Sequence, residues 1–325
     1  MKFILSNQRI VVFGSTGMVG KAVLRALGRE GYSMVLSPSR KELNLLDRND
    51  VQKWFEKFKP NVVILAAAKV GGIFANNEYP ADFILENLKI QTNIIECSWK
   101  NNIKKFLFLG SSCIYPKYAS QPIKEEELLS GPLEPTNQWY AVAKIAGLKL
   151  CEALNKQYNF NSICLMPTNL YGPGDNYHKN NSHVVPGLIN RFYDAKLKKE
   201  EKVLCWGSGQ PFREFLHVDD LAEACLFTLE NWDINDDFAP KDVHGQKLSY
   251  LNVGTGNDIT ISELARLIAQ IIGFKGKILW DNSKPDGTPR KQLDVGRIKQ
   301  LGWKPKITLE KGLKDTINLF LEQQS

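Results

Sequence analysis

The sequence predicts a doubly wound α/β fold, in which helices cover both faces of a parallel β-sheet, followed by a smaller α/β lobe. Over the first 170 residues, short apolar runs rich in β-branched side chains alternate with longer stretches whose apolar residues recur every three or four positions. A glycine-rich turn also follows the first apolar run directly. Because 43% of the 325 residues are hydrophobic and 24% are charged, the chain can bury a large core.

The first lobe is predicted to span residues 1–170. Its short apolar runs predict strands at 9–13, 33–37, 62–65, 106–109 and 162–166. Between them, apolar residues at helical spacing predict helices at about 18–30, 49–58, 81–100 and 137–159. Strands that alternate with helices in this way form parallel sheets, so a Rossmann-type arrangement is expected here.

The second lobe is predicted to occupy mainly residues 171–325 and to bind the substrate. Its expected elements are a helix from Val184, a strand near 203–206, a helix capped around His217, a strand at 251–253, a helix opened by Thr260 with capping-box spacing, and a terminal helix after Thr308. The two lobes are expected to exchange segments, with residues from about 210 to 232 returning to the first lobe.

Charge and cysteine usage limit the environment and the partners of the chain. The net charge of +7 suits anionic small ligands or nucleic acid, but the sequence has neither a basic stripe nor a recognisable nucleic-acid module, which argues against nucleic acid. No two of the six cysteines have the C-x-x-C spacing, which argues against structural zinc. This cysteine usage favours a reducing compartment. No run approaches the roughly 20 apolar residues of a membrane span. We therefore expect a cytoplasmic protein that binds no metal and no membrane.

The glycine-rich turn predicts a dinucleotide site. It opens a helix after the first strand, where glycines allow backbone amides to approach a pyrophosphate at the helix N-terminus. The alternative is a tight turn with a purely structural role. The candidate cofactor contacts in this turn are Gly14, Ser15, Thr16, Gly17, Met18, Val19 and Gly20.

The end of the second predicted strand favours NADP(H) over NAD(H). NAD-binding folds usually place a carboxylate about 20 residues after the turn, where it binds the ribose hydroxyl. Here Arg40 and Lys41 occupy that region, and their charges suit a 2′-phosphate. The alternative is a solvated basic turn. Asp47 follows and could reach the adenine edge or simply start a helix.

A tyrosine and a lysine four residues apart predict catalysis. Tyr140 and Lys144 lie on one face of the predicted helix at 137–159. A free tyrosine titrates near pH 10, so it exchanges protons at neutral pH only when a neighbouring cation stabilises the phenolate. Lys144 is expected to supply that cation. The fourth strand delivers Ser111 and Ser112 to the carboxyl end of the sheet, where Ser111 would hold a carbonyl oxygen.

Together these residues resemble the extended short-chain dehydrogenase/reductase superfamily, in the branch that acts on nucleotide-activated sugars. Further segments over nearly the whole chain resemble the GDP-L-fucose synthase family: LAAAKVGGI at 65–73, GSSCIYPK at 110–117, PTNLYGP at 167–173, SHVVP at 182–186, WGSG at 206–209, REFLHVDD at 213–220 and KPDGTPRK at 284–291. The resemblance implies NADPH-dependent C4 reduction of a GDP-linked 4-keto sugar, coupled to epimerisation at C3 and C5.

The resemblance also implies roles for individual residues. Cys113 and His183 match the pair that exchanges protons at C3 and C5, although Cys113 could instead be a small core residue and His183 a loop histidine that contacts backbone. Further matching cofactor positions are Ala67, Leu109, Gly110, Pro167, Asn169, Leu170 and His183, besides Tyr140 and Lys144. The matching substrate positions are Ser112, Asn169, Arg191, Trp206, Arg213 and Asp286.

Two departures from the family pattern leave alternatives open. Some members carry a basic residue where this chain has Ser15 and Thr16, so Arg40 takes more of the 2′-phosphate recognition here. The polar segment 231–249 is expected in the substrate lobe, where it would change which sugar is accepted. A GDP-4-keto-heptose C4 reductase without epimerisation is therefore the nearest alternative.

A non-catalytic NADP-binding regulatory protein is the alternative from a different class, and the presence of both Tyr140 and Lys144 argues against it. The helices at about 81–100 and 137–159 resemble the pair that forms a dimer interface in this superfamily, so a homodimer is expected.

Overall fold

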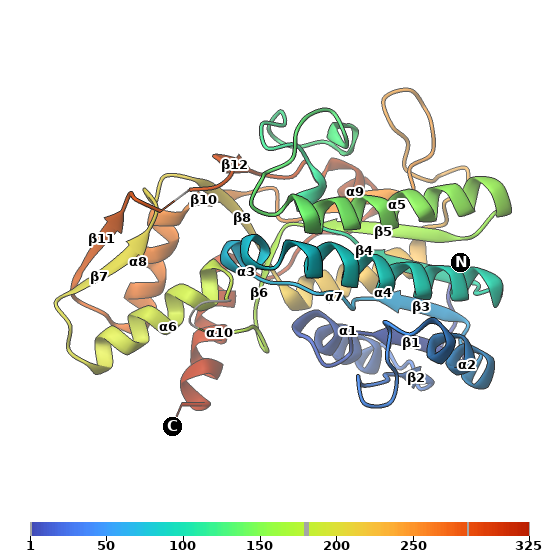
Figure 1. The fold of residues 1–325 in the computed structure, drawn as a ribbon, viewed down its shortest axis with the longest axis horizontal. Helices are drawn as coiled ribbons and strands as arrows, with labels where there is room; N and C mark the ends of the chain where they lie inside the picture. Colours follow the sequence, from blue (N-terminus) through green and yellow to red (C-terminus); the bar gives the residue numbers. More distant parts are fainter. Residues whose placement is uncertain (1, 179–181, 285, 325) are drawn as a thin grey trace.

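A six-stranded parallel sheet forms the centre of the computed structural model, which describes residues 2–178, 182–284 and 286–324 (Figure 1). The strands lie in the order β2-β1-β3-β4-β5-β9, which reverses direction at β1. Their bounds are β1 Ile10–Phe13, β2 Val35–Leu36, β3 Val62–Leu65, β4 Lys105–Leu109, β5 Ser162–Pro167 and β9 Tyr250–Val253. The parallel sheet confirms the predicted fold class.

Helices pack against the sheet in two groups. Helix α4 lies between α2 and α5, whereas α1 lies beside α7. The connection through α1 leads toward one edge of the sheet, whereas the connections through α2, α4 and α5 lead toward the other edge. Because such crossovers are right-handed, α1 lies on one face of the sheet and α2, α4 and α5 lie on the other. The bounds are α1 Met18–Arg29, α2 Arg48–Phe58, α3 Ile73–Glu78, α4 Pro80–Lys100, α5 Gln138–Tyr158 and α7 Val218–Asn231.

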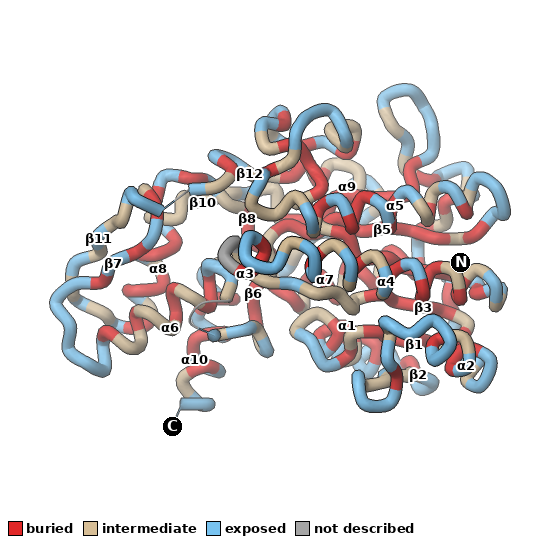
Figure 2. Tube along the Cα trace, in the orientation of Figure 1, coloured by how far each residue is buried: buried red, intermediate tan, exposed pale blue. Residues whose placement is uncertain are grey.

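The burial of the sheet explains why its strands read as continuous apolar runs. Every residue of β1, β3, β4 and β5 is buried, and Figure 2 shows these strands as the buried centre of the larger lobe. Strands covered on both faces need no polar alternation. The predicted helices and the first five strands agree with the structure to within a few residues.

The second lobe has a core of its own, built around α6, α8 and α10. One small sheet has the order β10-β8-β12, with β6 also paired to β8, and a second joins β7 and β11. The bounds are β6 Asn169–Tyr171, α6 Val184–Leu197, β7 Lys202–Trp206, β8 Phe212–His217, β10 Asp258–Thr260, α8 Ile261–Ile272, β11 Lys277–Asp281, β12 Arg290–Lys291 and α10 Leu309–Glu322. Figure 1 shows β8 and β12 where the two lobes meet.

Parts of the C-terminal half return to the first lobe. Helix α7 packs against α1, and β9 joins the large sheet beside β5, whereas β8 stays in the second lobe. Short elements connect these parts: η1 Ser112–Ile114, η2 Glu125–Glu127 and α9 Gly296–Leu301.

The expectation that segment 231–249 belongs to the substrate lobe is wrong. The Val243 backbone amide donates to Glu126 in η2, and the Arg297 guanidinium in α9 donates to the Lys241 carbonyl. The segment is anchored in the core of the first lobe by three buried apolar side chains, Trp232, Ala239 and Leu248. Its polar residues therefore cover the first lobe, and they give no reason to expect an altered substrate.

Within the described residues, none of the helices is both long and apolar enough to span a membrane.

Candidate active site

The glycine-rich turn forms a cradle that excludes side chains. Gly14 has φ +89°, and a Cβ there would lie 2.6 Å from the backbone nitrogen of Ala67. A Cβ on Gly20 would overlap the carbonyl oxygen of Gly14. Gly17 caps α1 without a side-chain hydrogen bond, so the first N–H groups of the helix have no capping acceptor. These residues fit a dinucleotide, because close backbone approach and free helix N–H groups bind a pyrophosphate.

The residues around this cradle have distinct structural roles. The Ser15 hydroxyl is buried and donates to the carbonyl of Ser37 at 3.3 Å, which ties the turn to the end of β2. Thr16 and Arg40 are exposed beside the turn and after β2, respectively. The Asp47 carboxylate accepts from the first N–H groups of α2, so the helix-start role that the sequence left open is present. A contact between Asp47 and adenine stays a prediction.

Most other predicted cofactor residues lie at the carboxyl ends of strands. Leu109 ends β4, Pro167 ends β5, and Ala67 follows β3 closely. Gly110 follows β4, and a Cβ there would overlap the sulfur of Met166. Two others, Asn169 and Leu170, lie in β6. This edge of a doubly wound sheet is where such folds bind ligands.

Tyr140, Ser111 and Lys144 come together between β4 and α5. The Ser111 hydroxyl lies close enough to the Tyr140 phenol to lower its pKa. The Lys144 ammonium is buried and donates to the Leu109 carbonyl at 2.7 Å, and it lies 5.7 Å from the centroid of the Tyr140 ring. Burial lowers the pKa of Lys144 to about 7.

The expectation that Lys144 lowers the pKa of Tyr140 is not met. Burial and the nearby Cys113 raise this pKa, and the neighbouring Ser111 hydroxyl opposes them only in part. The Lys144 ammonium points to the Leu109 carbonyl and does not bind the phenol oxygen, which explains the difference. Tyr140 is therefore a protonated phenol at neutral pH, as a proton donor must be.

Cys113 lies in η1, where its sulfur has two nitrogen donors. The Asn137 side-chain amide donates to Sγ at 3.4 Å, and the Lys291 ammonium donates at 3.6 Å. The backbone N–H of Cys113 donates to the Ser111 hydroxyl at 3.2 Å. Cys113 is partly accessible, whereas the other five cysteines are buried. The alternative that Cys113 is a core residue is therefore not supported. The neighbouring Ser112 is buried.

His183 is the N-cap residue of α6, and its side chain makes no capping hydrogen bond. It is exposed, yet the surrounding protein lowers its pKa by desolvation. Without a bound ligand, the neutral form of the imidazole is therefore favoured at pH 7.

The predicted substrate residues form two contacts in the second lobe. The Arg191 guanidinium lies 5.6 Å from the Trp206 ring centroid, and the Trp206 side chain is 53% exposed. The Arg213 guanidinium donates to the Asp286 carbonyl oxygen at 3.3 Å. The Asp286 carboxylate accepts from the Ser208 backbone N–H at 2.7 Å and from its hydroxyl at 2.8 Å. An exposed indole next to Arg191 and Lys284 suits a nucleoside diphosphate.

Comparison with known proteins identifies the family. The model of the NAD dependent epimerase/dehydratase family matches residues 10–239. The chain belongs to this family. A GDP-L-fucose synthase of Escherichia coli (strain K12) is 52% identical over 98% of the chain and 98% of its own length. GDP-L-fucose synthase 1 of Arabidopsis thaliana is 51% identical over 97% of the chain and 94% of its own length.

A solved structure extends the comparison. A GDP-mannoheptose C4 reductase of Campylobacter jejuni, with NADP bound, is 35% identical, has a TM-score of 0.88, and covers 98% of this chain and 99% of its own length. The two synthases confirm the resemblance to GDP-L-fucose synthases that the motifs predicted.

Two residues at this family site were missed from the sequence. Lys291 lies within a segment that resembles the GDP-L-fucose synthases, but its residue type alone indicates no role there, and the position of Asn137 in the sequence indicates only the start of a helix. Lys291 is 178 positions from Cys113, so no local pattern signals their contact. The family match ends at residue 239, before this lysine.

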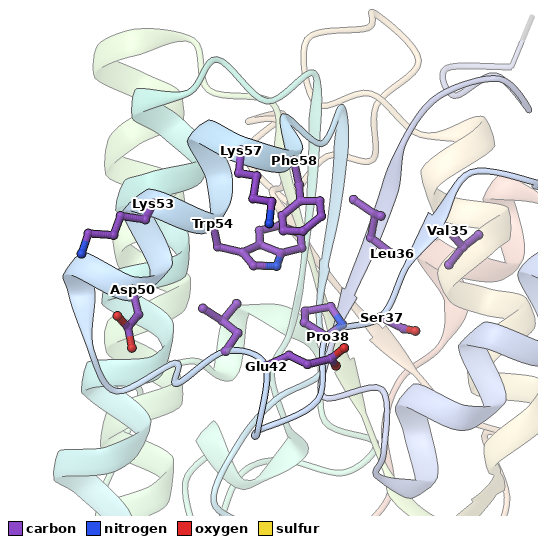
Figure 3. Close-up of a pocket in the computed structure, with 11 residues that line it drawn as sticks. Val35, Leu36, Ser37, Pro38, Glu42, Asp50, Lys53, Trp54, Lys57 and Phe58 are labelled. Carbon is purple, nitrogen blue, oxygen red and sulfur yellow. The ribbon is translucent and has the colours of Figure 1, made fainter.

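A cavity of about 700 Å³ lies apart from these residues (Figure 3). Strand β2 lines it with Val35 and Leu36, and helix α2 lines it with Trp54 and Phe58. None of the predicted catalytic residues lines this cavity, so its volume does not mark the active site of this family member.

Proposed function

We propose that the protein reduces C4 of a GDP-linked 4-keto-6-deoxy sugar with NADPH and inverts C3 and C5 of the same sugar beforehand, as a GDP-L-fucose synthase does. The observation that carries this proposal is the junction of β4 and α5. There, the neighbouring side chains of Tyr140 and Ser111 lie next to a partly accessible Cys113 with nitrogen donors on its sulfur. A ketone reductase needs a proton donor and a hydrogen-bond donor such as Tyr140 and Ser111. An epimerase needs a base such as Cys113.

The reduction uses Tyr140, Ser111 and Lys144. NADPH, when bound, supplies the hydride for C4. Ser111 donates a hydrogen bond to the C4 oxygen and stabilises the charge that develops on it. Tyr140 then gives this oxygen its proton, which its raised pKa keeps on the phenol at neutral pH. Lys144 holds its proton more readily next to the negative charge of a bound dinucleotide.

The epimerisation uses Cys113 and His183. The hydrogens on C3 and C5 of a 4-keto sugar are acidic, because either carbanion is delocalised into the C4 carbonyl as an enolate. One base and one acid that flank C4 can therefore serve both carbons. Cys113 accepts the proton, and His183, protonated to the imidazolium beside the negative charge of the bound substrate, returns one to the opposite face, which inverts the carbon.

The GDP group is held by the second lobe. The exposed indole of Trp206 stacks on the base, and the guanidinium groups of Arg191 and Arg213 bind the diphosphate. Asp286 holds the segment around Ser208 beside this site. In this way the substrate lobe supplies the cations that a sugar nucleotide needs.

Arg40 selects NADPH by its charge. It is exposed after β2, near the glycine cradle, and the glycine-rich turn contains no basic residue that could also bind the 2′-phosphate. Arg40→Ala is expected to raise the KM for NADPH about tenfold or more and to change the KM for NADH little, because one charge-assisted contact to phosphate is lost. Lys304→Ala, which removes the charge of an exposed lysine elsewhere, is the matched control. Equal changes for both cofactors would remove Arg40 from the phosphate site.

The protein is also proposed to be a homodimer and to function in the cytoplasm. Support for a dimer comes from exposed apolar side chains on the neighbouring helices α4 and α5, namely Leu85, Trp139 and Val142. Sedimentation that gives only the monomer mass at micromolar concentration would exclude the dimer. All six cysteines are free thiols, which suits a reducing compartment.

A second function follows from one of the solved relatives. The Campylobacter jejuni enzyme is named a GDP-mannoheptose C4 reductase, so a C4 reductase of a GDP-4-keto-heptose without epimerisation is the alternative. The two functions differ in substrate and in product configuration. The test is to incubate the protein with NADPH and a panel of GDP-4-keto hexoses and heptoses, and then to determine each product by NMR. Preferred turnover of the 6-deoxyhexose with inverted C3 and C5 supports the first function, and heptose reduction without inversion supports the second.

A further inference from the structure

Three separate parts of the chain meet at the sulfur of Cys113. Cys113 follows β4, Asn137 is the N-cap residue of α5, and Lys291 ends β12. The Asn137 amide lies 3.4 Å and the Lys291 ammonium 3.6 Å from Sγ. Two N–H donors on one sulfur favour the thiolate over the thiol, because the thiolate is the stronger acceptor and carries the opposite charge to the ammonium.

Lys291 is held in place by its neighbours. Strand β12 pairs in parallel with β8, and the register aligns Lys291 with Arg213. On one side of Lys291, the Arg290 guanidinium donates to the Asp258 carboxylate at 2.6 Å. On the other side, the backbone N–H of Gln292 donates to the Gln121 side chain at 3.0 Å. The backbone on both sides is therefore fixed, and the ammonium is delivered to one place.

The other groups that face Cys113 do not replace this cation. Tyr140 on α5 is a neutral phenol, and the Ser111 hydroxyl accepts from the Cys113 backbone. Arg213 on β8 interacts electrostatically with Cys113, but its guanidinium donates to the Phe212 and Asp286 carbonyl oxygens. Lys291 is therefore the cation with a direct contact to the sulfur.

We propose that Lys291, assisted by the Asn137 amide, holds Cys113 as a thiolate and thereby makes it the proton acceptor of the epimerisation. This inference rests on the proposed function and adds a positioning residue to it. The thiolate takes a proton from C3 or C5 and becomes a thiol, and the C–H electron pair moves into the enolate. An acid on the opposite face, His183 in the proposed mechanism, then gives a proton to the same carbon. Proton exchange with water restores both groups, and hydride transfer to C4 needs neither of them.

The first test measures the reactivity of Cys113 toward iodoacetamide as a function of pH, in the full chain without substrate. Alkylation requires the thiolate, and the five other cysteines are buried, so Cys113→Ser identifies the signal. Lys291→Met is expected to slow alkylation at pH 7 about tenfold and to move its pH midpoint up by about one unit. Lys291→Arg keeps the cation and is expected to retain the wild-type midpoint to within about 0.3 units. Lys304→Met, which removes the charge of an exposed lysine elsewhere, is the matched control.

The second test measures deuterium incorporation at C3 and C5 of a GDP-4-keto-6-deoxy sugar in D₂O. Lys291→Met is expected to slow this exchange about tenfold with little change in KM, and Lys291→Arg is expected to restore it. Unchanged alkylation of Lys291→Met at every pH would overturn the inference. If this variant also had a raised KM, the result would assign Lys291 to substrate binding. Alkylation needs no substrate, so it still tests Lys291 if the wild type turns over no GDP-4-keto sugar and the proposed function fails.

Discussion

At the scale of single residues, Tyr140 combines two properties that a proton donor in a reduction needs. Its phenol lies beside the Ser111 hydroxyl, and burial raises its pKa, so the proton stays on the oxygen until the alkoxide forms. The neighbouring Lys144 has a pKa lowered by burial to about 7, so its charge responds to a bound anion near neutral pH. Protonation states at this site are therefore governed by burial more than by direct ion pairs.

Tyr140→Phe is expected to lower kcat for NADPH oxidation by about 10²- to 10⁴-fold, because the C4 oxygen loses its proton donor. The Kd for NADPH should change less than about threefold, since the ring is retained. Steady-state kinetics and fluorescence titration measure the two quantities. Tyr158→Phe, at the other end of α5, is the matched control and should behave as the wild type. More than a tenth of wild-type turnover in Tyr140→Phe would remove this residue from the chemistry.

Lys105 provides a pH-dependent prediction outside the active site. It is 1% exposed at the start of β4, its ammonium donates to the Trp232 carbonyl, and burial lowers its pKa to about 8 from the ordinary 10.5. Between about pH 8 and 10.5, the unfolded chain binds this proton and the folded chain does not. The contribution of Lys105 to stability therefore rises with pH across this window, and below pH 8 the folded state carries the full desolvation cost.

Lys105→Met removes this desolvation cost, so the free energy of unfolding of the variant should exceed that of the wild type by the largest amount below pH 8. This difference between variant and wild type should fall by about 1–3 kcal/mol between pH 7 and 10. Urea denaturation at several pH values measures the difference, and Lys104→Met, which changes an exposed neighbour, controls for net charge. A difference that does not vary with pH would show that the pKa of Lys105 is not lowered in the folded state.

At the scale of elements, the turn from β1 into α1 is built by contacts that tolerate no side chain. Gly20→Ala forces the first turn of α1 away from the Gly14 carbonyl. We expect it to lower the free energy of unfolding by about 1–3 kcal/mol and to weaken NADPH binding at least tenfold. Gly28, in the same helix, has open space around its Cβ position. Gly28→Ala should raise stability by about 0.5 kcal/mol and leave binding unchanged.

Calorimetry with NADPH and thermal unfolding compare these two variants directly. Equal NADPH affinity in Gly20→Ala and Gly28→Ala would mean that the turn does not hold the cofactor.

Elements with strong local signals could be predicted from the sequence, and elements defined by distant partners could not. Thr260 forms the predicted capping box with Glu263 at the start of α8, and Asp47 caps α2. In contrast, the two-residue strand β12 exists because it pairs with β8. The strand at 251–253 was predicted, but not that it joins the large sheet beside β5 as β9. These pairings depend on contacts across the chain, which no short window contains.

The candidate site divides in the same way. The glycine turn and the Tyr140–Lys144 spacing are local patterns, and the sequence predicts them. The contact of Lys291 with Cys113 joins positions that are 178 residues apart, so only the folded chain reveals it. The direction of the Tyr140 pKa was also beyond the sequence, because it depends on burial and on where the Lys144 ammonium points.

At the scale of the whole molecule, two hydrophobic cores flank one site. The larger core holds the sheet and its helices, and the smaller one holds α6, α8 and α10 (Figure 2). The cofactor cradle belongs to the first lobe and the Trp206 surface to the second, so we propose that a sugar nucleotide and a dinucleotide meet between the lobes. Part of the excess of seven positive charges would attract these two ligands, because both carry phosphates.

The most direct test of the central claim is one reaction in D₂O: the protein, NADPH and GDP-4-keto-6-deoxy-mannose, with the product analysed by NMR. The account predicts that NADPH is oxidised and that the GDP-sugar product carries deuterium at C3 and C5, with both centres inverted and C4 reduced. A product reduced at C4 that keeps protium and the original configuration at C3 and C5 would contradict the coupled epimerisation, and an unchanged NADPH signal would contradict the reductase itself.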